Sequence, residues 1–240
     1  MRSCFLTSNP TMGAGETLNP ANGFAEELKR ALPARINALV VCSDPDGFDR
    51  TDVFARKLAR ALQNEGFGLQ ECRVLDRRTQ KDAAELLGAA ELVILAGGHV
   101  PTQNRFFREL GLKALLQGFG GTILGISAGS MNSADVVYAQ PELPGEAADP
   151  RYEKFLPGLG LTKTMLLPHY QLTKDETLDG MKLFGEITGR DSMGRRFYAI
   201  PDGSYLFIRG QTEELRGEAH LVENGTIRQL ASEGGRLALR

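Results

Sequence analysis

A serine flanked by glycines is the clearest candidate for chemistry in the chain. Ser127 lies in Gly125-Ile126-Ser127-Ala128-Gly129, a G-x-S-x-G pentapeptide that follows the apolar run Thr122-Ile123-Leu124. This pattern is typical of a nucleophile elbow, a sharp turn between a strand and a helix. The glycines leave room where the turn crowds its neighbours, and the helix N-terminus favours a developing oxyanion. A glycine-rich turn with an incidental serine is the alternative interpretation.

A serine nucleophile needs a general base at neutral pH, and the chain has three histidines. We predict His169 as the base, because it follows an apolar run at an expected strand end. His99 is the alternative and directly follows Gly97-Gly98. A residue beside oxyanion donors is badly placed to take the serine proton and be oriented by a carboxylate as well. His220 lies in a late strand, where we expect a structural role.

An acid should orient His169, and the residues alone leave three candidates open. Asp135, Glu142 and Glu146 all follow the serine closely. Asp135 is expected on or just after the helix that starts at the elbow, whereas Glu142 lies in a proline-bounded loop that could reach over the site. Each of the three is equally compatible with a solvated surface acid.

The glycine pair Gly97-Gly98 predicts a second part of the site. It follows the apolar run Glu91–Ala96, so its backbone N–H groups could face the end of a strand. We expect the N–H groups of Gly98 and Ala128 to form an oxyanion hole, as in acyl-transfer enzymes. A flexible strand-to-helix turn is the alternative. A phosphate-binding loop is not expected, because the residues do not continue as G-x-G-x-x-G.

Composition excludes several function classes. The net charge of -2 leaves no electrostatic footprint for nucleic acid. No apolar run is long enough for a membrane span, and the first residues lack a signal segment, so we expect a cytoplasmic protein. Three dispersed histidines argue against a metal centre, and no cofactor is predicted. Cys4, Cys42 and Cys72 are expected to be buried free thiols.

The first 130 residues alternate between strand-like and helix-like segments. Strands are expected over 2–7, 36–42, 69–75, 91–96 and 121–125, and helices over 24–32, 49–64, 79–87 and 104–116, the last broken at Gly111. This alternation predicts a parallel sheet with helices on both faces. Ligands bind at the carboxyl ends of such strands, which is where the glycine pair and the serine are expected.

The second half is expected to add antiparallel strands. A capping box at Thr173-Lys174-Asp175-Glu176 predicts a helix that runs through Ile187. The turn dipeptides Asp202-Gly203 and Asn224-Gly225 each predict a hairpin. We see no linker and no repeat, so residues 1–240 are expected to form a single α/β domain.

Together these motifs resemble peptidase family S51, the peptidase E group that contains aspartyl dipeptidase and the cyanophycinases. The resemblance rests on Gly97-Gly98, Gln103, the Gly125–Ser130 block and Pro168-His169-Tyr170. It covers most of the chain. It implies a flavodoxin-like sheet similar to that of class I glutamine amidotransferases.

The resemblance also implies roles for individual residues. Ser127 matches the nucleophile, His169 the histidine, and Glu142 the acid about fifteen positions after the serine, where the family dipeptidase has aspartate. Gly98 and Ala128 match the oxyanion hole.

The expected function is hydrolysis of dipeptides or short peptides by a serine peptidase. The alternatives are an esterase-like acyl hydrolase and a catalytically silent binding protein. Gly97-Gly98-His99 departs from the Gly-Gly-Asn common in the family, so a preference for N-terminal aspartate is not carried over. Gln103 and Arg105 are the candidates for substrate binding. The expected partner is a small peptide, with no nucleic acid or membrane, and a homodimer is left open.

Overall fold

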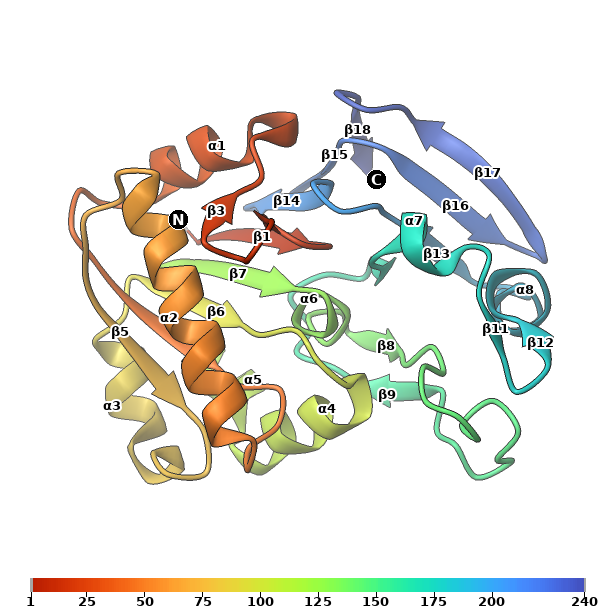
Figure 1. The fold of residues 1–240 in the computed structure, drawn as a ribbon, viewed down its shortest axis with the longest axis horizontal. Helices are drawn as coiled ribbons and strands as arrows, with labels where there is room; N and C mark the ends of the chain where they lie inside the picture. Colours follow the sequence, from red (N-terminus) through yellow and green to blue (C-terminus); the bar gives the residue numbers. More distant parts are fainter. Residues whose placement is uncertain (1, 240) are drawn as a thin grey trace.

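The largest sheet of the computed structural model, which describes residues 2–239, has eight strands (Figure 1). They are β1 (Ser3–Thr7), β4 (Ile36–Val41), β5 (Leu69–Leu75), β6 (Leu92–Leu95), β7 (Thr122–Ile126), β14 (Tyr205–Arg209), β15 (Thr212–Arg216) and β18 (Arg236–Leu239). Their order is β18-β15-β14-β1-β7-β6-β4-β5. The adjacent strands β1, β7, β6, β4 and β5 are parallel to one another. The strands β14, β15 and β18 continue the sheet beyond β1 in antiparallel order. The expected α/β fold is confirmed.

Helices cover both faces of this sheet. They are α1 (Phe24–Ala31), α2 (Phe48–Asn64), α3 (Ala83–Gly88), α4 (Val100–Glu109) and α5 (Leu112–Gln117), with short 3-10 turns at Ala21–Gly23 and Gln80–Asp82. One core joins α1 and α2 to the sheet through buried side chains such as Phe24 and Leu58. The other joins α3, α4 and α5 to the opposite face through side chains such as Leu86 and Phe106. Parallel strands buried on both faces explain the continuous apolar runs in the sequence.

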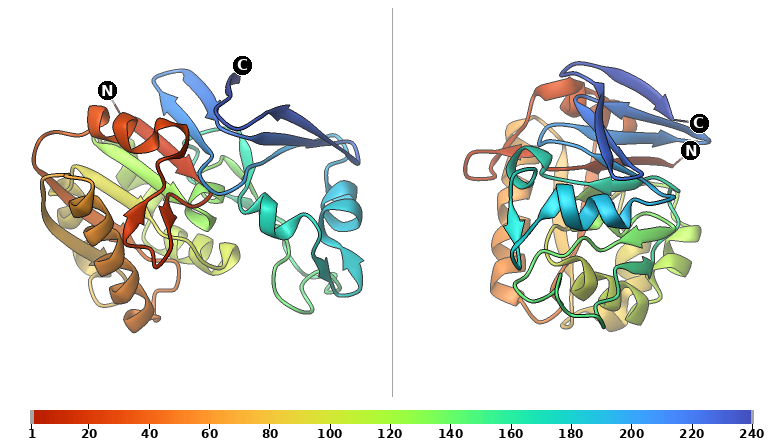
Figure 2. Two further views of the ribbon diagram at one scale, coloured as in Figure 1. Left: turned by 45° about the horizontal axis from the view of Figure 1, so that its top comes forward. Right: turned by 90° about the vertical axis from the view of Figure 1, so that its right-hand side faces the viewer.

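A second sheet of four strands lies beside the first. Its strands are β10 (Met165–Leu167), β13 (Arg196–Ala199), β16 (Ala219–Glu223) and β17 (Thr226–Ala231), in the order β10-β13-β16-β17. Figure 2 shows the β16–β17 hairpin reaching across to the segment around α8 (Gly189–Asp191). There the turn residue Asn224 donates its N–H to the carbonyl of Ser192. β16 and β17 pair in antiparallel order across this turn, so the hairpin expected at Asn224-Gly225 is confirmed.

The short helix α6 (Ala128–Met131) joins the two sheets. Its residues Ala128 and Met131 share a core with Leu167, Phe197 and Val222 of the second sheet. Further short elements surround this core: β2 (Thr11–Met12), β3 (Thr17–Leu18), β8 (Val136–Tyr138), β9 (Phe155–Pro157), α7 (Tyr170–Thr173), β11 (Thr177–Leu178), β12 (Met181–Lys182) and a π-helical turn at Leu183–Thr188. Ser127, which lies between β7 and α6, is therefore held between the two sheets.

The expected helix from Thr173 to Ile187 is wrong. After α7 the chain forms the small hairpin of β11 and β12, and only then the π-helical turn. The turn residues Asp179 and Gly180 both have positive φ, of 51° and 80°. An Asp-Gly pair with two positive φ angles favours a tight hairpin turn, and this preference outweighs the capping-box signal.

The hairpin expected at Asp202-Gly203 is also wrong. The strands on either side, β13 and β14, belong to different sheets and do not pair with each other. The dipeptide lies instead in the connection that carries the chain from the second sheet back to the first. Asp202 consequently lies where the two sheets meet, rather than at an exposed hairpin tip.

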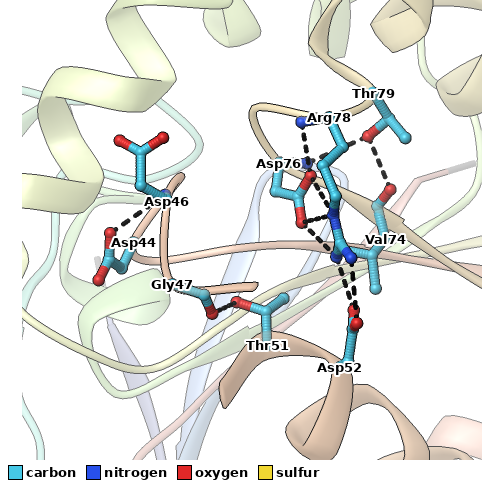
Figure 3. A network of polar contacts seen from close by, with 9 residues as sticks. All are labelled: Asp44, Asp46, Gly47, Thr51, Asp52, Val74, Asp76, Arg78 and Thr79. Carbon is cyan, nitrogen blue, oxygen red and sulfur yellow. Dashed lines mark hydrogen bonds and ion pairs between the residues drawn. The ribbon is translucent and has the colours of Figure 1, made fainter. Parts of the chain in front are cut away.

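A polar network fixes the carboxyl ends of β4 and β5 (Figure 3). The Arg78 guanidinium donates to both oxygens of Asp76 and to both oxygens of Asp52 on α2. Asp76 is fully buried, so this pairing offsets the cost of burying its charge. Nearby, the Asp44 carboxylate accepts the N–H of Asp46 and shapes the loop after β4. The network anchors the loops that follow β4 and β5.

The remaining expectations concern the cysteines and the membrane. All three cysteines are free; Cys4 and Cys42 are buried, as expected, whereas Cys72 is half-buried. Burial raises the pKa of Cys4 to about 11 and that of Cys42 to about 12, which keeps both as thiols. Within residues 2–239, no helix is long and apolar enough to cross a membrane.

Candidate active site

Ser127 lies at a strained turn between β7 and α6. Its backbone has φ 51° and ψ -113°, a conformation that residues with a side chain rarely adopt. The surroundings explain the flanking glycines: a Cβ on Gly129 would overlap the carbonyl of Leu95, and one on Gly125 would lie 3.0 Å from the backbone of Ser130. The Ser127 N–H donates to the carbonyl of Thr7 at 3.0 Å. The turn thus has the geometry of a nucleophile elbow.

His169 meets this serine from the second sheet. It follows β10 and has left-handed backbone angles, φ 59° and ψ 28°, which turn the chain into α7. Its Nε2 lies 2.9 Å from Ser127 Oγ, within hydrogen-bond distance. The sequence-predicted nucleophile and base are therefore brought together, in the arrangement that a serine–histidine pair requires.

Asp202, rather than Glu142, contacts the other ring nitrogen of His169. Asp202 Oδ1 lies 2.8 Å from His169 Nδ1. Burial opposes ionisation of Asp202, but hydrogen bonds from His169 and Ser8 outweigh it, so the pKa of Asp202 is lowered below its ordinary value. The carboxylate thus stays charged and holds the imidazole in one orientation.

Ser8 ties these groups to the main sheet. It follows β1, and its hydroxyl donates to Asp202 Oδ1 at 2.6 Å while accepting the backbone N–H of His169 at 2.8 Å. One hydroxyl therefore positions both the acid and the histidine. The sequence contains no signal for this role, because Ser8 lies in an ordinary polar loop far from both partners in the chain.

Gly98 and Ala128, the predicted oxyanion donors, both lie next to Ser127. Gly98 lines the same cavity as Ser127, and Ala128 follows Ser127 at the start of α6. Among the described residues, neither N–H donates to a protein acceptor. Gly98 has φ 153°, and a Cβ there would overlap Ser43 after β4. Only glycine therefore fits this close approach of the two strand ends.

Glu142 does not occupy the predicted position beside His169. Its Oε1 accepts the backbone N–H of Val100 at 3.2 Å, at the start of α4. The carboxylate lines the cavity of Ser127 but makes no hydrogen bond or ion pair with His169. Desolvation, together with the negative charge of Glu146, raises the pKa of Glu142 above its ordinary value. The predicted contact fails because the proline-bounded loop runs toward α4 rather than toward the end of β10.

His99 and Glu146, which the sequence left open as base and acid, pair with each other. His99 Nε2 lies 2.8 Å from Glu146 Oε1, and His99 Nδ1 lies 2.8 Å from Thr102 Oγ1. Asp135, the third candidate for the acid, is exposed and lies 3.3 Å from Lys113 Nζ. His99 and Glu146 therefore join the loop after Pro141 to the start of α4, and neither lines the cavity of Ser127.

The two predicted substrate-binding residues do not line the cavity. Gln103 is fully buried, donates to the Ala96 carbonyl at 2.6 Å and accepts from Asn132 Nδ2 at 3.0 Å. It thus braces α4 against the end of β6 and α6. Arg105 is exposed on α4 and makes no hydrogen bond or ion pair among residues 2–239. The structure assigns neither residue to the substrate.

The cavity itself is small, with a volume of about 120 Å³. Its walls come from α4, the elbow, the loop after β8, the end of β10 and the β11–β12 hairpin. They are formed by Gly98, Val100, Ser127, Met131, Gln140, Pro141, Glu142, Pro168, His169, Thr173, Glu176, Thr177, Leu178 and Leu183. Within the described residues, no group of His, Cys, Asp and Glu side chains has the arrangement of a metal site.

Two solved structures share the fold of this chain. A peptidase from an acI-B1 actinobacterium shares the fold with a TM-score of 0.68 and 17% identity, covering 100% of this chain and 97% of that one. A candidate peptidase E protein from Listeria monocytogenes EGD-e has a TM-score of 0.60 and 16% identity, covering 96% of this chain and 100% of that one. None of the curated proteins matches the sequence. The model of peptidase family S51 matches residues 45–216. The chain belongs to peptidase family S51.

Proposed function

We propose that this chain is a serine peptidase that hydrolyses dipeptides or short peptides, with Ser127 as nucleophile, His169 as base and Asp202 as the orienting acid. The observation that carries the proposal is the unbroken chain of contacts from Ser127 Oγ through the two ring nitrogens of His169 to Asp202 Oδ1. Membership of peptidase family S51 supports the choice of reaction.

The reaction follows from the roles of these groups. Ser127 Oγ attacks the carbonyl carbon of the peptide and passes its proton to His169 Nε2. The N–H groups of Gly98 and Ala128 stabilise the resulting oxyanion. The C–N bond then breaks, and His169 returns the proton to the leaving amine. Water, deprotonated by His169, hydrolyses the acyl ester and regenerates Ser127.

The shape of the cavity supports a short substrate. Its volume of about 120 Å³ leaves little space beside Ser127, and its roof comes from the loop after β8 and the β11–β12 hairpin. The Asp179 carboxylate joins these two segments, because it accepts the N–H groups of Gly145 and Ala147 at 2.8 and 3.0 Å. A free peptide end enters such a site more readily than the middle of a folded chain.

Dipeptide hydrolysis by the wild type and the Ser127→Ala variant tests the proposal. We expect release of free amino acids from X-Leu dipeptides and labelling of Ser127 by a fluorophosphonate, both lost in the variant, while its circular dichroism spectrum stays unchanged. Peptidase activity that survives in Ser127→Ala would refute the assignment. Hydrolysis of p-nitrophenyl esters without any dipeptide hydrolysis would favour the esterase alternative. Absence of both turnover and labelling would favour a silent binding protein.

A further inference from the structure

Apart from His169, the proposed base, the ionisable side chains that line the cavity beside Ser127 are carboxylates. Glu142 and Glu176 are the carboxylates among its lining residues, and neither lysine nor arginine lines it. Glu142 comes from the loop after β8, and Glu176 precedes β11, so the two carboxylates reach the cavity from different segments. A substrate group that enters this cavity therefore meets two acids beside the nucleophile.

The protein leaves these two charges without a strong partner. Among residues 2–239, Glu176 makes no ion pair and no side-chain hydrogen bond. Glu142 Oε1 accepts the Val100 N–H, and its distance to His99 Nε2 is 3.9 Å. His99 is already paired with Glu146 at 2.8 Å, so it contributes little to Glu142. Both acids are consequently available to a ligand.

The position of Glu142 is fixed before any ligand binds. Glu146 Oε2 accepts the N–H groups of Glu142 and Leu143, both at 2.9 Å, and thereby closes the loop on itself. The contact of Asp179 with Gly145 and Ala147 holds the same loop from the other side. A carboxylate held in place in this way loses little conformational freedom on binding, which favours affinity.

The charges of a dipeptide decide which end fits this cavity. A dipeptide carries an ammonium group on its first residue and a carboxylate on its second. The cavity carboxylates attract the ammonium group and repel the carboxylate of the dipeptide, because opposite charges attract and like charges repel at short distance. The first residue would then occupy the cavity and present its own carbonyl to Ser127. An aspartate side chain there would find no cation to pair with.

We propose that Glu142 and Glu176 bind a cationic group on the acyl side of the scissile bond, so that the enzyme selects against aspartate at that position. This inference rests on the proposed peptidase function. The cation has two chemical sources, the free α-ammonium group or the side chain of a basic residue. Both present N–H donors to carboxylate oxygens, and substrates with and without a blocked amine distinguish them.

The first measurement compares kcat/KM for Ala-Leu, Lys-Leu and Asp-Leu with their N-acetyl forms. We expect kcat/KM for N-acetyl-Ala-Leu, which carries no cation, to be about 5-fold below that for Lys-Leu, as for an exposed ion pair. Asp-Leu should be cleaved less efficiently than Ala-Leu. If N-acetyl-Lys-Leu keeps the efficiency of Lys-Leu, the cation is the side chain; if it loses that efficiency, the cation is the α-ammonium group.

The second measurement uses Glu142→Gln and Glu176→Gln, with Asp175→Asn as the matched control. Asp175 is an exposed neighbour of Glu176 that does not line the cavity. The two Gln variants should each raise KM for Lys-Leu by about 3- to 5-fold, as for the loss of an exposed ion pair. They should also narrow the ratio of kcat/KM between Lys-Leu and N-acetyl-Ala-Leu, whereas Asp175→Asn should leave that ratio at the wild-type value.

Three results would overturn this inference: a preference for Asp-Leu, equal cleavage of Lys-Leu and the cation-free N-acetyl-Ala-Leu, or a ratio of kcat/KM between these two substrates that is unchanged in both Gln variants. Each of these leaves peptidase activity intact, so the proposed function would survive them. Loss of fluorophosphonate labelling together with all peptide hydrolysis in the wild type would instead refute the proposed function, and this inference with it. Labelling of Ser127 in every Gln variant checks that the variants are folded and keep a competent nucleophile.

Discussion

Replacement of Asp202 by asparagine removes the charge that faces His169 while keeping the shape of the side chain. Asp202 Oδ1 and His169 Nδ1 are 2.8 Å apart. Two unit charges at this distance attract by about 6 kcal/mol at an effective dielectric constant of about 20. Their side chains are 25% and 31% exposed, so solvent screening reduces the value to about 4 kcal/mol. Because His169 carries a positive charge in the transition state, kcat should fall by about 1,000-fold.

The assay measures kcat and KM for leucine release from Ala-Leu, with Asp135→Asn as the matched carboxylate-to-amide control. Asp135 is exposed and lies outside the site, so its variant should keep the wild-type kcat. KM should change little in Asp202→Asn, because Asp202 does not line the cavity. A kcat within 10-fold of wild type in Asp202→Asn, with a loss of about 1,000-fold in Glu142→Gln, would refute the assignment and restore Glu142 as the acid.

The lowered pKa of Asp202 adds a prediction about stability. A carboxyl whose pKa is lower in the folded protein stabilises it above the ordinary carboxyl pKa, and this contribution disappears as the pH falls through the lowered value. Thermal midpoints recorded against pH should therefore drop less steeply on acidification in Asp202→Asn than in the wild type. Parallel curves for the two proteins would contradict this.

Three further substitutions test the surroundings of the site. Ser8→Ala removes the hydroxyl that joins the acid to the histidine backbone, and kcat should fall by about 10-fold, as expected for the loss of a hydrogen bond to a charged group; an unchanged kcat would exclude a positioning role. Gly98→Ala places a Cβ against Ser43 and should lower kcat by about 100-fold through the oxyanion site, which a kcat equal to wild type would contradict. Arg78→Ala leaves the buried Asp76 without its guanidinium and should lower the midpoint of urea unfolding with kcat unaffected, so a variant as stable as wild type would contradict the pairing.

Local sequence signals were sufficient for the parallel sheet, the elbow and the histidine. Continuous apolar runs mark strands buried on both faces, and the glycines around Ser127 reflect crowding by Leu95 and Ser130. His169 could be chosen because it follows an apolar run directly. In each case a residue's neighbours in the chain are enough to indicate its surroundings in the fold.

The contact of Asp202 with His169 could not be found in this way, because the position of Asp202 depends on how two sheets meet. Asp202-Gly203 has the pattern of an ordinary hairpin turn, and nothing nearby in the sequence indicates that β13 and β14 pair with different strands. Ser8 lies still further away in the chain from the residues that it contacts. Gln103 is polar in the sequence, but hydrogen bonds to Ala96 and Asn132 make it a core residue. Such contacts follow from topology, which the local pattern does not encode.

The contacts of the proposed triad depend on how the two sheets pack against each other. Ser127 and Ser8 follow strands of the main sheet, His169 follows a strand of the second sheet, and Asp202 lies on the segment that joins the two. A small displacement of one sheet against the other would break the 2.8 and 2.9 Å contacts long before either sheet loses its own hydrogen bonds. Enzyme activity should therefore disappear at lower urea concentrations than the backbone signal of circular dichroism. The loss of turnover would then report separation of the two sheets before either sheet unfolds.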